Sequence, residues 1–231
     1  MMFWIIFIGF MVISFAVRNR LKSKFRKYSK IALSNGLTGR EIAEKMLRDH
    51  QIHDVKVTCV PGELTDHYNP ANKTVNLSEP VYYGQSAAAA AVAAHECGHA
   101  VQHATAYSML EFRSTLVPVQ NVSAKILNFI MLAAFFGGFF LFKAIPLQTV
   151  LLIVIGAYTV ITLFSLVTLP VEFDASKRAT RWLKDTGITR EGELVMAKDA
   201  LHWAAMTYVV AAIGSMAMLA FYVLQFLGAG D

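Results

Sequence analysis

The chain has 231 residues, of which 55% are hydrophobic and only 16% are charged. A water-soluble domain has about 45–50% apolar and about 25% charged residues, so this composition argues against an ordinary soluble domain and indicates an integral membrane protein with a modest soluble part. The net charge of +5 is informative mainly through the positions of the basic residues, because these orient a membrane protein. Two cysteines far apart in the sequence indicate no disulfide framework.

The first apolar segment, residues 1–17, has no charged side chain and is near the lower length limit of about 17 residues for a membrane-spanning helix. A cleaved signal peptide would need basic residues before it and a small-residue cleavage site after it. Here the basic residues follow the segment, so we expect a retained transmembrane anchor with its N-terminus outside. Because the basic residues lie next to an anchor, we expect them to contact anionic lipid head groups rather than nucleic acid. These basic residues are Arg18, Arg20, Lys22, Lys24, Arg26, Lys27 and Lys30.

Residues 18–125 are expected to form the cytoplasmic catalytic part. Thr38 and Glu41 have the spacing of a capping box, which predicts a helix start. The segment 55–60 alternates in polarity and predicts a short strand, with Cys59 on its apolar face as a small packing residue. After turn-forming residues, segment 74–78 predicts a second strand. The two strands are expected to form a small sheet, although a loop with one strand fits the composition equally well.

The segment "AAHECGHAVQ" at residues 93–102 contains the most specific motif of the chain. His95 and His99 are four residues apart, so on a helix they project from one face and can hold one zinc ion. Zinc lowers the pKa of a bound water and polarises a scissile carbonyl, and Glu96 is placed to take the proton of that water. Gly98 leaves room for a close approach of another segment. The alternative is a chance match in an alanine-rich helix.

Three further apolar segments predict membrane spans: residues 126–142, 145–169 and 203–227. The alternative for residues 126–142 is a buried core helix. We expect residues 126–169 to form a transmembrane hairpin, with a tight outside turn near its only basic residue, Lys143. Residues 203–227 are expected to form a C-terminal transmembrane helix.

Basic residues beside these spans predict the topology, because they favour the cytoplasmic side. Residues 18–125 and 170–202 are expected inside, and both chain ends outside. The fold class predicted is therefore a mainly α membrane protein with about four transmembrane helices and a small cytoplasmic α+β zincin-like domain. The basic residues that follow the third span are Lys177, Arg178, Arg181 and Lys184.

A zinc peptidase needs a third protein ligand, and Glu172 is the best candidate. The hairpin returns the chain to the side of the HExxH helix just before Glu172. Glu111 lies on or just past the HExxH helix, too far along to turn back to the metal. His103 is about 12 Å along the helix from His95, too far to share one zinc ion with it. The alternative for Glu172 is an interfacial glutamate that caps the next helix.

These residues resemble a known family. HECGH at residues 95–99, followed by EFDA at residues 172–175, resembles the gluzincin pattern of membrane metallopeptidases such as the HtpX-like and CAAX prenyl proteases. The chain most closely resembles the YugP-like family of bacterial neutral zinc metallopeptidases. The similarity extends to residues 66–79 and 204–212, so it covers most of residues 60–215.

The resemblance implies that His95, His99 and Glu172 are the zinc ligands and that Glu96 is the general base. It also implies that strand 74–78 is an edge strand to which an extended substrate adds. The HtpX-like pattern has an aspartate four residues after the ligand glutamate, which orients a zinc histidine. This chain has Ser176 there, which leaves the orienting residue open, and Asp174 points elsewhere on a regular helix.

A metallopeptidase also needs a donor for the developing oxyanion. His202 and Tyr208, near the start of the last apolar segment, are the candidates. The alternative is that either residue belongs to the polar–aromatic belt at the membrane surface.

The predicted function is that of a zinc metalloendopeptidase of a bacterial plasma membrane, acting near the cytoplasmic face on membrane-associated proteins or peptides. The expected partners are the lipid bilayer and a protein or peptide substrate, without nucleic acid; the sequence leaves open whether there is an adaptor or an oligomer partner. One alternative is an intramembrane protease of the site-2 type, because residues 87–110 lack charge apart from Glu96. The other is a zinc-binding membrane scaffold without catalysis.

Overall fold

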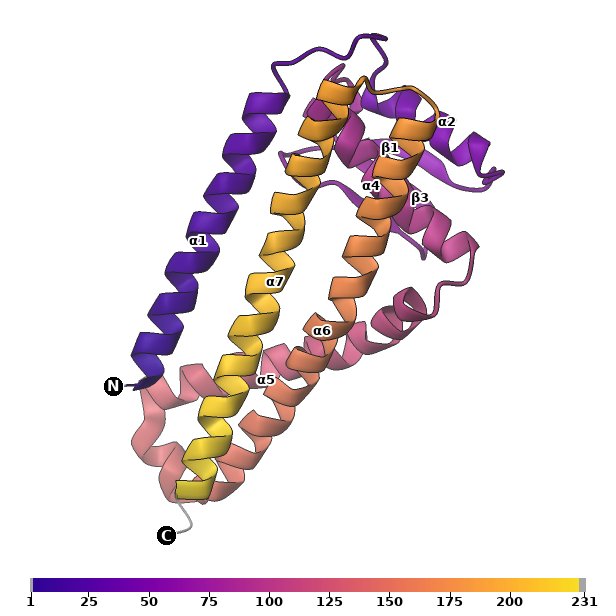
Figure 1. The fold of residues 1–231 in the computed structure, drawn as a ribbon. Coiled ribbons are helices and arrows are strands. Elements are labelled where there is room, and N and C mark those ends of the chain that lie inside the picture. Colours follow the sequence, from indigo (N-terminus) through magenta and orange to yellow (C-terminus); the bar gives the residue numbers. More distant parts are fainter. Residues whose placement is uncertain (1, 229–231) are drawn as a thin grey trace. The chain divides into compact units, whose positions relative to one another are not determined.

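The computed structural model describes residues 2–228, except for the side chains of residues 138–144. The side chain of Lys143, expected at the outside turn, and the C-terminal residues 229–231 lie outside the described part. The described chain is mainly helical, as predicted (Figure 1). Its elements are α1 (Met2–Tyr28), α2 (Gly39–Asp49), β1 (Lys56–Val60), β2 (His67–Asn69), β3 (Thr74–Ser78), α3 (Glu79–Tyr82), α4 (Ala87–Ala104), α5 (Ser108–Ala144), α6 (Leu147–Asp185) and α7 (Glu191–Gly228).

The chain divides into two compact units. The helical unit consists of Met1–Phe15, Phe112–Leu169 and Tyr208–Asp231. The mixed unit consists of Ala16–Glu111 and Pro170–Thr207, and it contains the strands and the HExxH helix. The long helices α1, α5, α6 and α7 each contribute residues to both units.

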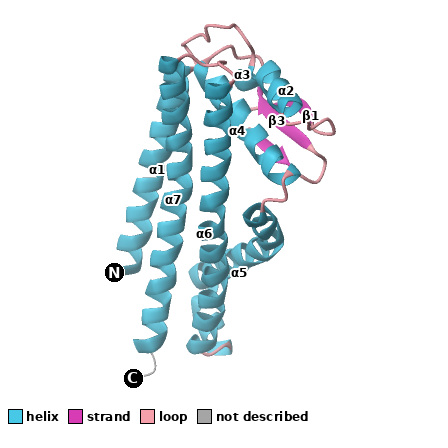
Figure 2. Cartoon of the chain, turned by 45° about the vertical axis from the view of Figure 1, so that its right-hand side comes forward, coloured by secondary structure: helices cyan, strands magenta, loops and turns pink. Residues whose placement is uncertain are grey.

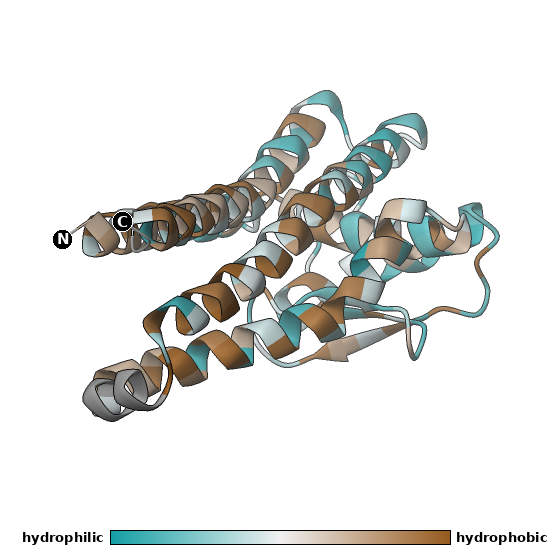
Figure 3. Cartoon of the chain, turned by 90° about the horizontal axis from the view of Figure 1, so that it is seen from below, coloured by the Kyte–Doolittle hydropathy of each residue, from teal (hydrophilic) through white to brown (hydrophobic). Residues whose placement is uncertain are grey.

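Four helices are long and apolar enough to cross a membrane, which confirms the predicted membrane character. They are Met2–Tyr28, Ser108–Gly137, Leu147–Asp185 and Glu191–Gly228. In the helical unit, large apolar side chains such as Ile5, Phe129 and Leu224 are 60–69% exposed, and brown, hydrophobic ribbon runs along the long helices in Figure 3. Such exposure is unfavourable in water but suits the hydrocarbon core of a bilayer.

The long helices continue beyond the apolar windows of the sequence. Helix α1 runs through the basic segment to Tyr28, since Lys and Arg are good helix formers. Helix α6 passes through Pro170 and ends only at Asp185. Helix α5 starts at Ser108, well before its apolar window, and contains a non-helical residue at Gly137.

The sheet of the mixed unit has the strand order β1-β3-β2. Strand β1 pairs in parallel with β3, from Lys56 opposite Thr74 to Val60 opposite Ser78, and β2 pairs antiparallel on the other side of β3. Figure 2 shows the strands beside α2 and α4. The expectation that residues 74–78 form an edge strand is therefore wrong: β3 is central, because neighbours on both sides use its backbone hydrogen-bonding groups.

The core of the mixed unit forms around α2 and α4. The predicted capping box is confirmed, since Thr38 accepts from the backbone of Glu41 and the Glu41 carboxylate accepts from the backbone of Thr38. Ile42 and Met46 of α2 are fully buried, as are most alanines of the run before the HExxH motif. Small side chains let neighbouring elements approach α4 closely, so an alanine run of modest hydrophobicity becomes the most buried helix of this unit.

The two cysteines differ from each other in environment. Cys97 on α4 is fully buried, and its Sγ lies 3.5 Å from the carbonyl oxygen of Ala43. Burial raises the pKa of the Cys97 thiol well above its usual range, so Cys97 is a small core residue. Cys59 on β1 is exposed, so the expectation that it packs in the core is wrong: the outer strand β1 turns this position to solvent.

Candidate metal centre

Helix α4 carries both histidines of the motif. It begins after Ser86, whose side chain accepts a hydrogen bond from the backbone of Ala89. His95 and His99 follow two and three turns later, and their rings lie edge to face with centroids 4.8 Å apart. Both residues are at most 9% exposed. The four-residue spacing thus places both imidazoles on one buried face of the helix, as the sequence predicts.

Glu172 on α6 completes this group. Its Oε2 lies 3.3 Å from Nε2 of His95 and 3.6 Å from Nε2 of His99, and the residue is 3% exposed. The ligand atoms of the three side chains all lie within 4.8 Å of one another. Two ligands about 2.1 Å from a tetrahedral zinc ion are about 3.4 Å apart, so the two distances from Glu172 to the histidines match those expected for zinc. Among the residues that the structure describes, this is the one His/Cys/Asp/Glu group with such geometry.

The backbones of α4 and α6 touch between the two histidines. A Cβ added to Gly98 would lie 2.7 Å from the carbonyl oxygen of Ala175 and 3.2 Å from its Cα. Only glycine permits this approach, and Ala175 is itself fully buried. The expected close approach at Gly98 is thus observed, and it brings the α6 segment with Glu172 against the histidines of α4.

Glu96 lies on the same helix, next to His95, and is held by the outer strand β2. The backbone N–H of Tyr68 donates a 2.9 Å hydrogen bond to Oε2 of Glu96, and Glu96 is 8% exposed. The hydroxyl of Tyr68 lies 2.6 Å from Nδ1 of His103, about two turns after Glu96 on α4. Tyr68 therefore contacts α4 at two points, and His103 serves this contact, as expected for a residue outside the ligand set.

A second carboxylate lies near Glu96. Asp66, just before β2, accepts hydrogen bonds from the backbone N–H of Ser78 at 2.7 Å and from its hydroxyl at 3.0 Å. Burial raises the pKa of Asp66; the negative charge of Glu96 raises it further, and the hydrogen bonds from Ser78 oppose the shift. Asp66 thus joins the start of β2 to the end of β3 beside the HExxH helix.

The electrostatic field of the site favours a cation. Burial lowers the pKa of His99, but the Glu172 carboxylate, 3.6 Å from Nε2, and the negative charge of Glu96 outweigh it, so the pKa of His99 is raised overall. Two buried carboxylates that stabilise a protonated imidazole would also stabilise a metal ion at the same place.

The other ring nitrogen of each histidine has a partner that the sequence leaves open. Nδ1 of His95 lies 3.1 Å from the hydroxyl of Ser176. Nδ1 of His99 lies 2.9 Å from Oε1 of Gln102, which sequence reasoning missed. Asp174 contacts Gln102 rather than a histidine, in agreement with the expectation that it points elsewhere. Gln102 stands three residues after His99 on the same helix face, and this spacing was the available signal.

The two oxyanion candidates on α7 lie in different units. His202 is exposed, and its ring lies edge to face with that of Trp203, with the ring centroids 5.9 Å apart. Tyr208 is half-buried and belongs to the helical unit. The roles of both residues stay predictions.

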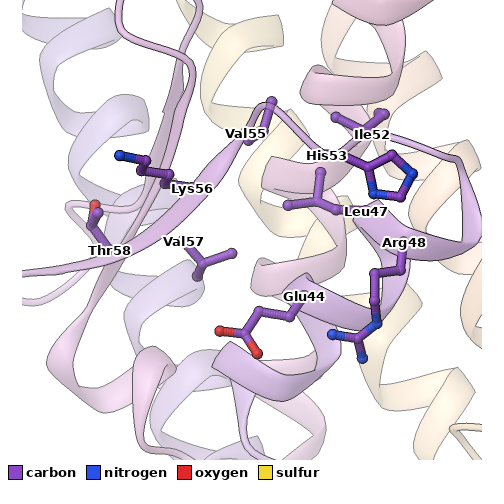
Figure 4. Close-up of a pocket in the computed structure, with 9 residues that line it drawn as sticks. All are labelled: Glu44, Leu47, Arg48, Ile52, His53, Val55, Lys56, Val57 and Thr58. Carbon is purple, nitrogen blue, oxygen red and sulfur yellow. The ribbon is translucent and has the colours of Figure 1, made fainter.

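A separate recess lies between α2 and β1 (Figure 4). Its volume is about 440 Å³. It is lined by Glu44, Leu47 and Arg48 of α2 and by Lys56, Val57 and Thr58 of β1, among others. None of the three candidate ligands lines it.

The fold and the site together have the features of membrane-bound zinc metallopeptidases. A family model described as "putative neutral zinc metallopeptidase" matches residues 3–227. The chain therefore belongs to this family, which confirms the resemblance inferred from the motifs.

The chain is also similar to a curated bacterial protein. The chain is 40% identical over 233 residues to the "putative membrane protease YugP" of Bacillus subtilis strain 168, and the alignment covers 100% of this chain and 99% of the relative. No solved structure matches the chain significantly.

Proposed function

We propose that this protein is a zinc-dependent endopeptidase that hydrolyses peptide bonds of membrane-associated proteins near the cytoplasmic face of a bacterial plasma membrane. The observation that carries the proposal is the convergence of His95, His99 and Glu172 next to Glu96 in one buried group. Membership of a zinc metallopeptidase family supports the same conclusion.

In this proposal His95 and His99 bind zinc through Nε2, and Glu172 binds it through a carboxylate oxygen. Zinc bound there supplies an acidified water and a polarised scissile carbonyl. Glu96 is the general base: its Oε2 is held by Tyr68, so Oε1 accepts the proton of the water and returns it to the leaving amine nitrogen. His202 and Tyr208 stay the candidates for oxyanion stabilisation.

An extended segment of the substrate would lie along β2 rather than along β3. The central strand β3 has neighbours on both sides, whereas β2 is an outer strand whose Tyr68 touches Glu96. Backbone pairing with an outer strand gives affinity without demanding a particular sequence. Such pairing with β2 would suit a peptidase that cleaves unfolded or extended segments of membrane proteins.

The cytoplasmic location rests on the basic residues. The mixed unit contains the candidate metal centre and two basic clusters. The first cluster begins at Arg18, after the first span, and the second begins at Lys177, after the third span. Basic residues beside spans favour the cytoplasmic side, so the mixed unit and its site are proposed to face the cytoplasm.

The test of the assigned base is Glu96→Gln in purified full-length protein. We expect a loss of peptide hydrolysis of at least 100-fold, in the range for removal of a general base, with unchanged zinc content. Glu191→Gln, an exposed position in the first turn of α7, is the matched control and should keep full activity. Retained activity in Glu96→Gln would refute the role of Glu96.

The two alternatives differ from this proposal in what they predict. A zinc scaffold without catalysis predicts zinc binding and no turnover in the wild type. An intramembrane protease of the site-2 type would need α4 to lie in lipid. Among the described helices α4 is not one of the four long apolar ones, and it is buried by elements of the mixed unit, which favours a site beside the membrane.

A further inference from the structure

Gln102 is the buried side chain with the most specific contacts around the candidate metal centre. It lies on α4, one turn after His99, and it is fully buried. A buried amide needs partners for both its oxygen and its NH2 group. Gln102 has partners for both, and they lie on two different helices.

The contacts of Gln102 fix the orientation of its amide. Nε2 donates to the carbonyl oxygen of Val171 at 2.8 Å and to Oδ2 of Asp174 at 2.9 Å. A backbone carbonyl can only accept a hydrogen bond, so the group that faces Val171 must be the NH2. Oε1 must then face His99 Nδ1, 2.9 Å away.

This orientation also fixes the tautomer of His99. An amide oxygen only accepts, so Nδ1 of His99 must carry a proton. The lone pair of the neutral ring then lies on Nε2, the nitrogen that faces Glu172 at 3.6 Å. The partner of His95 is different, because the hydroxyl of Ser176 can either donate or accept and so imposes no tautomer.

We propose that Gln102 is a positioning residue that holds His99 in the tautomer required to bind metal through Nε2. This inference rests on the proposed function, because it assumes that His99 is a ligand. Val171 and Asp174 flank Glu172 on α6. Gln102 therefore links the orientation of the His99 ring to the helix segment that carries Glu172. Asp174 is held in turn by Arg178, whose Nε donates to the same oxygen at 2.6 Å.

The test is the zinc affinity of full-length Gln102→Met, measured by competition with a chelator. Methionine keeps the side-chain volume but has no amide, and we expect a loss of about 10- to 100-fold, the usual effect of removing an outer partner of a metal ligand. Gln85→Met, an exposed position before α4, is the control and should bind zinc like the wild type. Thermal unfolding of the metal-free proteins shows whether both variants fold.

Two further measurements separate positioning from packing. In zinc-loaded protein labelled with ¹⁵N-histidine, the wild type should give a slowly exchanging Nδ1–H signal from His99, and Gln102→Met should lose it. Gln102→Glu sets a carboxylate oxygen against Val171 and Asp174, so it should weaken zinc binding. Adding Asp174→Asn supplies a donor to that oxygen and should recover at least part of the loss.

Wild-type affinity and an unchanged His99 signal in Gln102→Met would overturn the inference, as would the absence of recovery in the double variant. His99→Ala distinguishes this failure from that of the proposed function. If His99→Ala loses zinc while Gln102→Met does not, only the positioning role is wrong. If neither loses zinc, the metal centre itself is wrong.

Discussion

Gly98 and Ala175 bring two helices into backbone contact at the centre of the site. A Cβ at position 98 would lie 2.7 Å from the carbonyl oxygen of Ala175, closer than side-chain carbons approach a backbone. The histidines on α4 and Glu172 on α6 stand on either side of this contact, so the helix spacing determines the separation of the ligand atoms.

Gly98→Ala is therefore expected to move α4 and α6 apart. The variant should lose about 1–3 kcal/mol of stability, as for other overpacked cores, and should bind zinc more weakly because Glu172 retreats from His95 and His99. Thermal unfolding in detergent and zinc titration measure the two effects. Gly192→Ala is the control, because an added Cβ there has no neighbour within 4 Å; equal effects of both substitutions would contradict the prediction.

Ser176 is expected to orient His95 through its hydroxyl. Ser176→Ala leaves Nδ1 of His95 without the partner that lies at 3.1 Å, and the zinc affinity should fall by about tenfold. Ser176→Thr keeps the hydroxyl and should stay within a few-fold of the wild type in the same chelator competition. Equal losses in Ser176→Ala and Ser176→Thr would indicate packing rather than orientation.

The pKa of Asp66 predicts a pH dependence of stability. Burial and the charge of Glu96 raise this pKa in the folded state above its ordinary value of 3.8, so the folded protein takes up the proton more readily than the unfolded chain. The charged carboxylate then costs stability at neutral pH, and this cost disappears as the pH falls through the raised pKa.

Asp66→Asn keeps an acceptor for Ser78 without the charge, so it should stabilise the protein at neutral pH. The gain should shrink as the pH falls through the raised pKa of Asp66 toward 3.8. Denaturant unfolding of both proteins at several pH values measures this difference. A gain that grows toward low pH would have the wrong sign.

Cys59 gives a direct test of the proposed orientation, because it is exposed in the mixed unit and Cys97 is buried. A membrane-impermeant maleimide should label the protein in inverted membrane vesicles but not in intact spheroplasts. Cys59→Ser should abolish the labelling, since Cys97 is shielded. Labelling of intact spheroplasts would place the mixed unit, and the site with it, outside the cell.

The sequence predicts well those features that depend on local spacing. The i, i+4 spacing places His95 and His99 on one helix face, and the polarity pattern of residues 74–78 predicts β3 with its observed bounds. Features that depend on distant partners are not predictable in this way. The three-residue strand β2 stands next to the turn at Asn69-Pro70, and only its pairing with β3 makes it a strand.

The same limit explains the corrected expectations. Strand β3 is central because β1 and β2 pair on both sides of it, and Cys59 is exposed because β1 is an outer strand. Gln102 lies close to the motif in sequence, but its partners Val171 and Asp174 are about seventy residues away. The sequence predicts that the segment with Glu172 meets the HExxH helix, but local spacing does not predict which residues of that segment pair with Gln102.

The central claim is that Glu172 completes a zinc site with His95 and His99. The most direct measurement is the zinc stoichiometry and affinity of purified full-length wild type beside Glu172→Ala, with Glu191→Ala as the exposed control. We expect one tightly bound zinc per chain in the wild type and the control, and a loss of at least 100-fold in affinity in Glu172→Ala, because two histidines alone leave the site one protein ligand short. Unchanged stoichiometry and affinity in Glu172→Ala would contradict the account.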